Sequence, residues 1–206
     1  MDSPSPLWRG AAPLLLASTS PTRRALLTSA GLTVETQAPG VDERAVEAAC
    51  AGLGPVDLAL RLARAKAEAV AARVPDRIVV GADQVLECDG IVFHKPADAA
   101  AARTQLARLA GRTHRLHAAV ALCGGGHPPD SFVETAHLTV RPLDAAAIAA
   151  YVGRAGPAAT ASVGAYQLEG LGIHLFTRID GDHTTILGLP LLPLLARLRA
   201  RQLLAF

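Results

Sequence analysis

The chain has 206 residues, of which 50% are hydrophobic, 18% are charged and only 3% are aromatic. This length corresponds to one large domain or to two lobes that share a core, and the scarcity of aromatic rings argues against a stacking platform for single-stranded nucleic acid. The 20 basic residues nearly balance the 18 acidic ones and form no basic tract, which argues against a protein held to DNA or a membrane by charge. We therefore expect a small-molecule partner.

The N-terminus and the cysteines indicate the cellular setting. Residues 1–12 are rich in Pro, Ser and Gly and predict a flexible leader, with a single domain over residues 13–206. The apolar run at 14–17 is too short for a signal sequence or a membrane span. The three cysteines are far apart and suggest neither a disulfide framework nor a zinc site, which fits a cytoplasmic protein.

The first third of the chain predicts a strand, a polar turn and then helices. The apolar run at 14–17 is typical of a buried strand, and Ser20 followed by Pro21 marks the start of a helix that Gly31 ends. The helices expected here cover residues 21–30, a short segment beginning near Asp42, and residues 55–73.

The rest of the chain predicts both strands and helices. An apolar strand over 77–80 runs into Gly81-Ala82-Asp83, and Asp89-Gly90 predicts a hairpin turn. The strands expected beyond it cover residues 91–93, 113–122 and 132–140, with a hairpin over 173–188. The helices expected cover residues 98–110, 145–152 and a Leu-rich segment from about Pro190.

The start of the first helix is a candidate anion site. A helix N-terminus presents free backbone N–H groups and the positive end of the helix dipole. The segment from Ser18 to Arg24 adds the hydroxyls of Ser18 and Ser20 and the guanidinium groups of Arg23 and Arg24. Phosphate is the natural ligand of such a group. The alternative is an ordinary capped helix with solvated arginines.

Lysine is rare, because only Lys66 and Lys95 are lysine among the 20 basic residues. On a helical projection Lys66 lies in line with Leu62 and Val70, opposite the charged stripe of the same helix. A lysine on the inner face either extends past the core to solvent or reaches a buried anion. We favour the buried anion.

Two acidic residues are candidate ligands for a metal ion. Asp83 comes directly after an apolar strand, where parallel α/β sheets place groups that face ligands, although it could simply cap a turn. Glu43 could be only a first-turn helix residue. If Glu43 and Asp83 converge, their oxygens can hold Mg²⁺ beside phosphates that Arg23, Lys66 and Lys95 neutralise. Together these residues predict a triphosphate site.

Several segments, in one order, resemble the Maf family of nucleoside triphosphate pyrophosphatases. They are LLLASTSPTRRALLTSAGL, VDE, LALRLARAKAEAV, VVGADQVLECDG, HKP, LAGRTHRL, SVGAYQLEG and GLPLLPLLARL, and the match spans roughly residues 13–198. The resemblance implies an α/β fold with two lobes and a long, twisted, mixed β-sheet flanked by helices, like that of inosine triphosphatases. It also implies a divalent cation, Mg²⁺ or Mn²⁺, and a homodimer.

The resemblance further implies hydrolysis of a nucleoside triphosphate, standard or modified, to the monophosphate and pyrophosphate. Such an activity would limit the incorporation of non-standard nucleotides into nucleic acids. By motif, Asp83 would accept the proton of the attacking water and join Glu43 at the metal. The residues expected to bind phosphate are Ser18, Ser20, Arg23, Lys66 and Lys95.

Three positions match those that select the base in the family: Thr22, Gln84 and Glu169. Gln84 and Glu169 resemble the residues of the branch that favours 7-methyl-GTP. The pyrimidine-preferring branch has threonine at the position of Gln84 and glutamine at that of Glu169. Thr22 departs from both branches, and His94 stands where glycine is usual before Lys-Pro. A different class of function is a nucleotide-binding regulator linked to cell division, in which the same pocket binds without turnover.

Overall fold

A computed structural model of the protein describes residues 7–206. Its strands are β1 (Leu14–Ala17), β2 (Val34–Thr36), β3 (Val79–Cys88), β4 (Ile91–Phe93), β5 (Thr113–Cys123), β6 (Asp130–Val140) and β7 (Phe176–Asp180). Its helices are α1 (Pro21–Ser29), α2 (Glu43–Ala49), α3 (Pro55–Ala71), α4 (Ala99–Leu109), α5 (Ala145–Ala155), α6 (Ala158–Ala161), α7 (His183–Ile186) and α8 (Leu191–Ala200). Two short 3-10 helices, η1 (Val163–Ala165) and η2 (Leu171–Leu175), precede β7.

The strands form one mixed sheet. Its order is β2-β1-β3-β5-β6-β7, and β4 pairs with β3 beside this path. β1 runs parallel to both β2 and β3, whereas β4 is antiparallel to β3 and β7 is antiparallel to β6. The expected α/β class with a mixed sheet and flanking helices is confirmed.

The chain divides into two compact units, and β3, β5 and β6 contribute residues to both. Within the described residues, the first unit consists of residues 7–84, Ala118–Glu134 and Leu187–Phe206, and the second of Val85–His117 and Thr135–Ile186. We call them unit 1 and unit 2.

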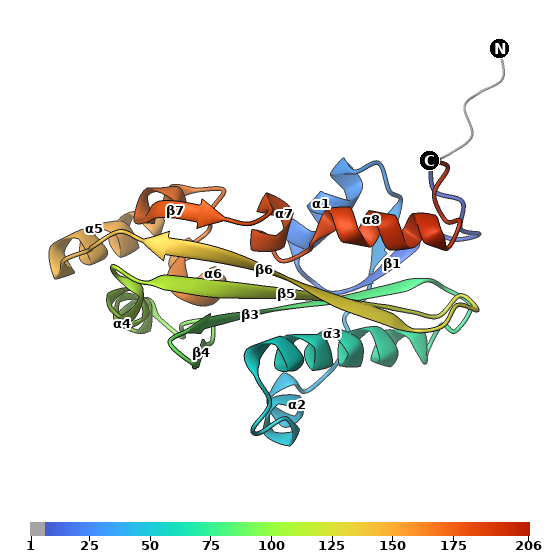
Figure 1. Ribbon diagram of the computed structural model, residues 1–206, viewed down its shortest axis with the longest axis horizontal. Coiled ribbons are helices and arrows are strands. Elements are labelled where there is room, and N and C mark those ends of the chain that lie inside the picture. Colours follow the sequence, from blue (N-terminus) through green and yellow to red (C-terminus); the bar gives the residue numbers. More distant parts are fainter. Residues whose placement is uncertain (1–6) are drawn as a thin grey trace, which may run out of the picture. The chain divides into compact units, whose positions relative to one another are not determined.

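In unit 1, helices cover both faces of the sheet (Figure 1). α1 and α8 bury Leu27, Leu194 and Leu198 against one face, while α3 lies on the other. The close fit of α3 depends on Gly81 in β3, because a Cβ there would lie 2.3 Å from the Ala63 carbonyl oxygen and 2.6 Å from the Ala67 nitrogen. Any larger residue would therefore push α3 away from the strand.

Unit 2 has its own hydrophobic core. Leu86, Leu116 and Leu138 of the sheet pack with residues of α4 and α5 such as Leu106 and Ile148. The turn between β3 and β4 is formed by Asp89 and Gly90, both with positive φ, as the hairpin prediction requires.

The structure corrects two sequence predictions. Asp83 does not end its strand, because β3 continues through Gly81 and Ala82 to Cys88. Residues 173–188 do not form a hairpin: only β7 is a strand, its partner is β6, and the short helix α7 follows. Asp182 accepts hydrogen bonds from the backbone N–H groups of Thr184 and Thr185, which favours a helical turn over a second strand.

Residues 1–6 of the expected leader lie outside the described residues. Within the remainder, Trp8 is buried in the core of unit 1, its ring nitrogen donates to the Ala12 carbonyl at 2.7 Å, and its backbone bridges to Leu204. This part of the expected leader is therefore packed onto the domain. Among residues 7–206, no helix combines the length and the hydropathy that crossing a membrane requires.

Candidate active site

A buried lysine joins two carboxylates in unit 1. The Lys66 ammonium nitrogen lies 2.5 Å from Asp83 Oδ1 and 2.8 Å from Glu43 Oε1. The side chains of Lys66 and Asp83 are only 8% and 10% exposed, whereas that of Glu43 is 53% exposed. The lysine on the inner face of its helix thus reaches a buried anion, as favoured from the sequence, and that anion is an acidic side chain of the chain itself.

The local structure explains how these groups meet. Lys66 lies on the buried stripe of α3 with Leu62 and Val70, and α3 lies directly on β3 because of Gly81. Asp83 follows Gly81 by two residues, so both lie on the same face of the strand. Glu43 is the first residue of α2, where Asp42 caps the helix by accepting a hydrogen bond from Ala45 N at 3.1 Å.

Burial dominates the electrostatics of Asp83. It raises the pKa of the Asp83 carboxyl, because the charged form loses its hydration, while the charges of Lys66 and Arg23 act in the opposite direction. A carboxylate with a raised pKa accepts a proton more readily at neutral pH. The Asp83 carboxylate, held in place by the hydrogen bond from Lys66, can therefore serve as a general base.

Arg23 is anchored to backbone carbonyls of β3 and of the loop before α8. Its Nε donates to the Gly188 carbonyl at 2.8 Å and its Nη1 to the Ala82 carbonyl at 2.9 Å. Burial lowers the pKa of the guanidinium, and the carboxylates of Asp83 and Glu43 raise it. Sequence reasoning missed the contact between Gly188 and Arg23, because no local pattern connects two residues so far apart. The Gly-Leu-Pro segment before α8 indicates a turn at Gly188 but not its partner.

Two predicted hydroxyls lie at the start of α1. Ser20 Oγ accepts from the backbone N–H of Arg23 at 3.3 Å, and Ser18 Oγ accepts from the backbone N–H of Ser20 at 3.1 Å. Ser18 is 6% exposed. Both the capped helix and the anion site remain compatible with this geometry, because each hydroxyl still has its own O–H to donate.

The predicted specificity residues are divided between the units. Thr22 on α1 and Gln84 in β3 are half-buried in unit 1, and a Cβ on Gly188 would lie 3.7 Å from the Gln84 amide carbon. Glu169 and Lys95 are exposed residues of unit 2. The structure brings Glu43, Lys66 and Asp83 into contact, whereas the roles of Lys95 and Glu169 stay predictions.

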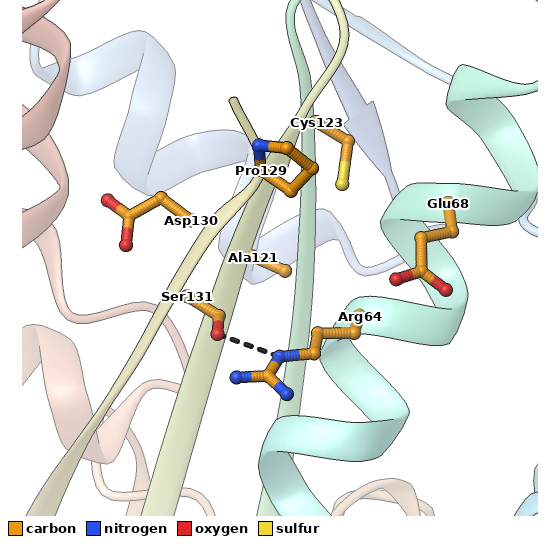
Figure 2. Close-up of a pocket in the computed structure, with 7 residues that line it drawn as sticks. All are labelled: Arg64, Glu68, Ala121, Cys123, Pro129, Asp130 and Ser131. Atoms are coloured by element: carbon orange, nitrogen blue, oxygen red, sulfur yellow. Dashed lines mark hydrogen bonds between the residues drawn. The ribbon is translucent and has the colours of Figure 1, made fainter. Parts of the chain in front are cut away.

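A surface cavity of about 440 Å³ also lies in unit 1, but it is not formed by the predicted site residues (Figure 2). Arg64 Nε donates to Ser131 Oγ at 2.8 Å on its wall. Arg64 is on α3 two residues before Lys66, and so projects from a different side of that helix. The cavity is lined by Arg64, Glu68, Ala121, Cys123, Pro129, Asp130 and Ser131.

The donor set of the candidate site suits a hard divalent cation only in part. Glu43 and Asp83 each place an oxygen within hydrogen-bond distance of one nitrogen, and Mg²⁺ is commonly held by one or two carboxylates plus substrate phosphates. Among residues 7–206, no group of three or more His, Cys, Asp or Glu side chains could hold a metal ion. Further ligands would have to come from the substrate or from water.

Comparison with known proteins gives consistent results over nearly the whole chain. A model of the Maf family, described as Maf-like protein, matches residues 13–201. A nucleoside triphosphate pyrophosphatase of Nitrobacter winogradskyi is 54% identical over 199 residues, which cover 97% of this chain and 98% of the relative. A 7-methyl-GTP pyrophosphatase of Rhizobium johnstonii is 53% identical over 188 residues, covering 90% and 94%.

Two solved structures are much less similar to this chain. A Ham1 protein of Staphylococcus aureus has a TM-score of 0.43 and 17% identity, covering 62% of this chain and 71% of its own. A dITP/XTP pyrophosphatase of Mycobacterium abscessus has a TM-score of 0.40 and 20% identity, covering 63% and 74%.

Proposed function

Because this chain belongs to the Maf family, we propose that it is a nucleoside triphosphate pyrophosphatase, a hydrolase that releases a nucleoside monophosphate and pyrophosphate. The proposal is supported by the names of relatives that share half or more of its residues over most of their length. Those names do not favour the alternative of a regulator without turnover. The structural observation that carries the proposal is the buried Asp83 carboxylate held on Lys66.

In the proposed reaction, water attacks a phosphorus atom, and the bond from that atom to the oxygen of the departing pyrophosphate breaks. Asp83 accepts the proton that the water loses. Its burial supports this role because the raised pKa favours proton uptake, and Lys66 fixes the orientation of the carboxylate. Positioning and charge would supply most of the rate, because the transferred phosphoryl group is only loosely bonded in the transition state.

The phosphates would bind at the start of α1 and on the lysines. Ser18 and Ser20 would donate their O–H groups, Arg23 and Lys66 would supply positive charge, and Lys95 would add a further ammonium. The partial burial of Arg23 supports its part, since a charge partly removed from water interacts more strongly with a phosphate.

We propose that Glu43 and Asp83 hold a divalent cation, Mg²⁺ or Mn²⁺, once a substrate supplies further oxygens. The bound cation would neutralise charge on the phosphates and on the leaving pyrophosphate. Convergence of the two carboxylates on the Lys66 ammonium supports this proposal, because it brings one oxygen of Glu43 and one of Asp83 within 2.8 Å of the same nitrogen.

For the base, we propose that Thr22, Gln84 and Glu169 select among nucleotides and that methylated GTP is preferred to UTP and dTTP. A glutamate accepts hydrogen bonds from the N1–H and amino group of guanine but offers no donor to the oxygens of uracil or thymine. The Rhizobium johnstonii relative named 7-methyl-GTP pyrophosphatase supports this choice.

We further propose a cytoplasmic homodimer that does not bind nucleic acid stably. The three cysteines are free and buried in the described part of the chain, which fits a reducing compartment. The formal net charge of +2 gives little attraction for a polyanion.

Product analysis tests the proposed activity. The purified protein is incubated with 7-methyl-GTP, GTP, UTP, dTTP and ITP in the presence of Mg²⁺ or Mn²⁺, and the products are separated and identified. We expect a monophosphate and pyrophosphate in equal amounts. Release of inorganic phosphate without pyrophosphate, or no product from any nucleotide, would refute the proposal.

A further inference from the structure

The helix that carries Glu43 has no anchor in the core. None of the seven residues of α2, all of which the structure describes, is buried, although Cys50 directly after it is. Short helices are usually held in proteins by packing of an apolar face. α2 contacts α3, but its least exposed residues, Val46 and Glu47, are only half-buried, so the position of Glu43 beside Lys66 also depends on the segments that flank α2.

The segment before α2 is held by an arginine that lies two residues after α3. Arg73 Nη2 donates to the carbonyl of Pro39 at 2.8 Å and to that of Ala38 at 3.3 Å. The same guanidinium is fixed to the last turn of α3, because Nε donates to the Ala69 carbonyl at 2.9 Å. Arg73 thus holds two successive carbonyls of the loop that leads to Glu43.

Only a few residues separate the held carbonyls from Glu43. Gly40 has a φ of +69°, a left-handed conformation that glycine adopts readily. Asp42 caps α2, which couples the end of the loop to the helix. Residues 40–42 therefore lead directly from the carbonyls bound by Arg73 to Glu43, and a displacement of those carbonyls would be passed on to α2.

We propose that Arg73 is a positioning residue for the active site: it fixes the loop at residues 38–39 and thereby holds Glu43 against Lys66. The inference rests on the proposed function, because that function makes the position of Glu43 matter for turnover. Arginine suits the task, since its planar fork can bond to α3 and to a loop carbonyl at once, whereas a lysine ammonium is a single point of contact.

A matched control separates this role from an ordinary helix-end contact. Arg154 in the last turn of α5 is also an exposed arginine, and its Nη1 donates to the Ala150 carbonyl four residues earlier at 3.3 Å. Arg154→Met therefore removes a comparable contact within a helix.

The test compares Arg73→Met, Arg154→Met, Glu43→Gln and the double variant Arg73→Met/Glu43→Gln. Hydrogen exchange by mass spectrometry follows the backbone amides of residues 43–49, and steady-state kinetics gives kcat and KM with the best nucleotide. We expect Arg73→Met to speed exchange in residues 43–49 and to lower kcat/KM about tenfold, because small displacements of catalytic groups are costly. Arg154→Met should change neither, and Arg73→Lys should restore little.

The double variant shows whether Arg73 acts through Glu43. If it does, Arg73→Met lowers kcat/KM by less than about twofold once Glu43 is already glutamine, because the two effects are not independent. An undiminished loss in the Glu43→Gln background, or exchange in residues 43–49 equal to that of the unmodified protein, would overturn the inference. Absence of pyrophosphate release by the unmodified protein would instead overturn the proposed function, and the exchange result would still decide how α2 is held.

Discussion

Replacing Asp83 with asparagine is expected to abolish turnover while the protein remains folded. The substitution keeps the shape of the side chain but removes its negative charge and its ability to take up a proton. Lys66 retains Glu43 as a partner at 2.8 Å, so its ammonium is not left alone in the interior. We therefore expect the free energy of unfolding to fall by only about 1–3 kcal/mol, the range for a buried polar group that loses one partner.

The effect on the reaction should be larger. A positioned general base typically contributes 10²–10⁴-fold to a rate, so loss of Asp83 should lower kcat on the order of 10³-fold. At about 1.4 kcal/mol per factor of ten, this corresponds to about 4 kcal/mol of activation free energy. Binding of the nucleotide should change little, because the contacts expected from Arg23 and the lysines remain.

The assay measures pyrophosphate release, with binding of a non-hydrolysable nucleotide analogue followed by calorimetry and stability by thermal unfolding. Glu87→Gln is the control, because Glu87 is also a buried carboxylate, 4% exposed and 2.8 Å from Arg115, but is not a predicted site residue. It should reduce stability slightly and leave kcat within about threefold, since it removes only the ion pair with the half-exposed Arg115. An Asp83→Asn variant that retains a tenth or more of the original kcat would refute the role of Asp83 as the base.

Three further predictions follow from the same structure. Lys66→Met should raise KM and lower kcat about tenfold or more. Lys66→Arg should also lower activity, because the planar guanidinium is too bulky between two carboxylates. Normal kinetics of Lys66→Met with altered stability alone would contradict the phosphate role of Lys66. The unmodified protein should hydrolyse methylated GTP with a higher kcat/KM than UTP or dTTP, and Glu169→Gln should narrow or reverse that gap; UTP or dTTP as the best substrate would refute the assignment of the base. Burial lowers the pKa of His114 to about 4 from its ordinary 6.5. As the pH falls from 6.5 to 4, the unfolded chain therefore binds a proton at His114 before the native state does, and the free energy of unfolding decreases by about 3 kcal/mol. Urea denaturation at several pH values should show this loss in the unmodified protein and a smaller one in His114→Gln, and equal slopes would show that His114 is not the cause.

Local signals in the sequence predicted most of the helices and the central feature of the site. Ser20 and Pro21 mark the start of α1, and Asp42 caps α2 as expected. The buried stripe of α3 placed Lys66 inside the protein, where it lies 6% exposed. These features depend on residues within one or two turns of each other, which is the range that periodicity and capping rules cover.

The errors come from contacts between distant segments. Glycine is typical of the end of a strand, yet Gly81 lies inside β3, where it pairs with Ala17 of β1 and leaves room for α3. The expected hairpin at 173–188 failed because β7 finds its partner in β6, in register with His137–Val140. Neither outcome has a local signal, because each is decided by a surface that forms elsewhere in the chain.

The anchoring of Arg23 determines when during synthesis the site can form. Arg23 and the Gly188 carbonyl that accepts its Nε hydrogen bond are 165 positions apart, and α8 lies beyond Gly188. A nascent chain has made all of α1, α3 and β3 long before Gly188 leaves the ribosome, so until then Arg23 lacks one of its two carbonyl anchors. Contacts of such long sequence separation form late because of the entropy of closing the loop. The proposed site is thus completed only near the end of translation, and a chain shortened before residue 188 would contain every predicted site residue but only one of the two carbonyls that hold Arg23.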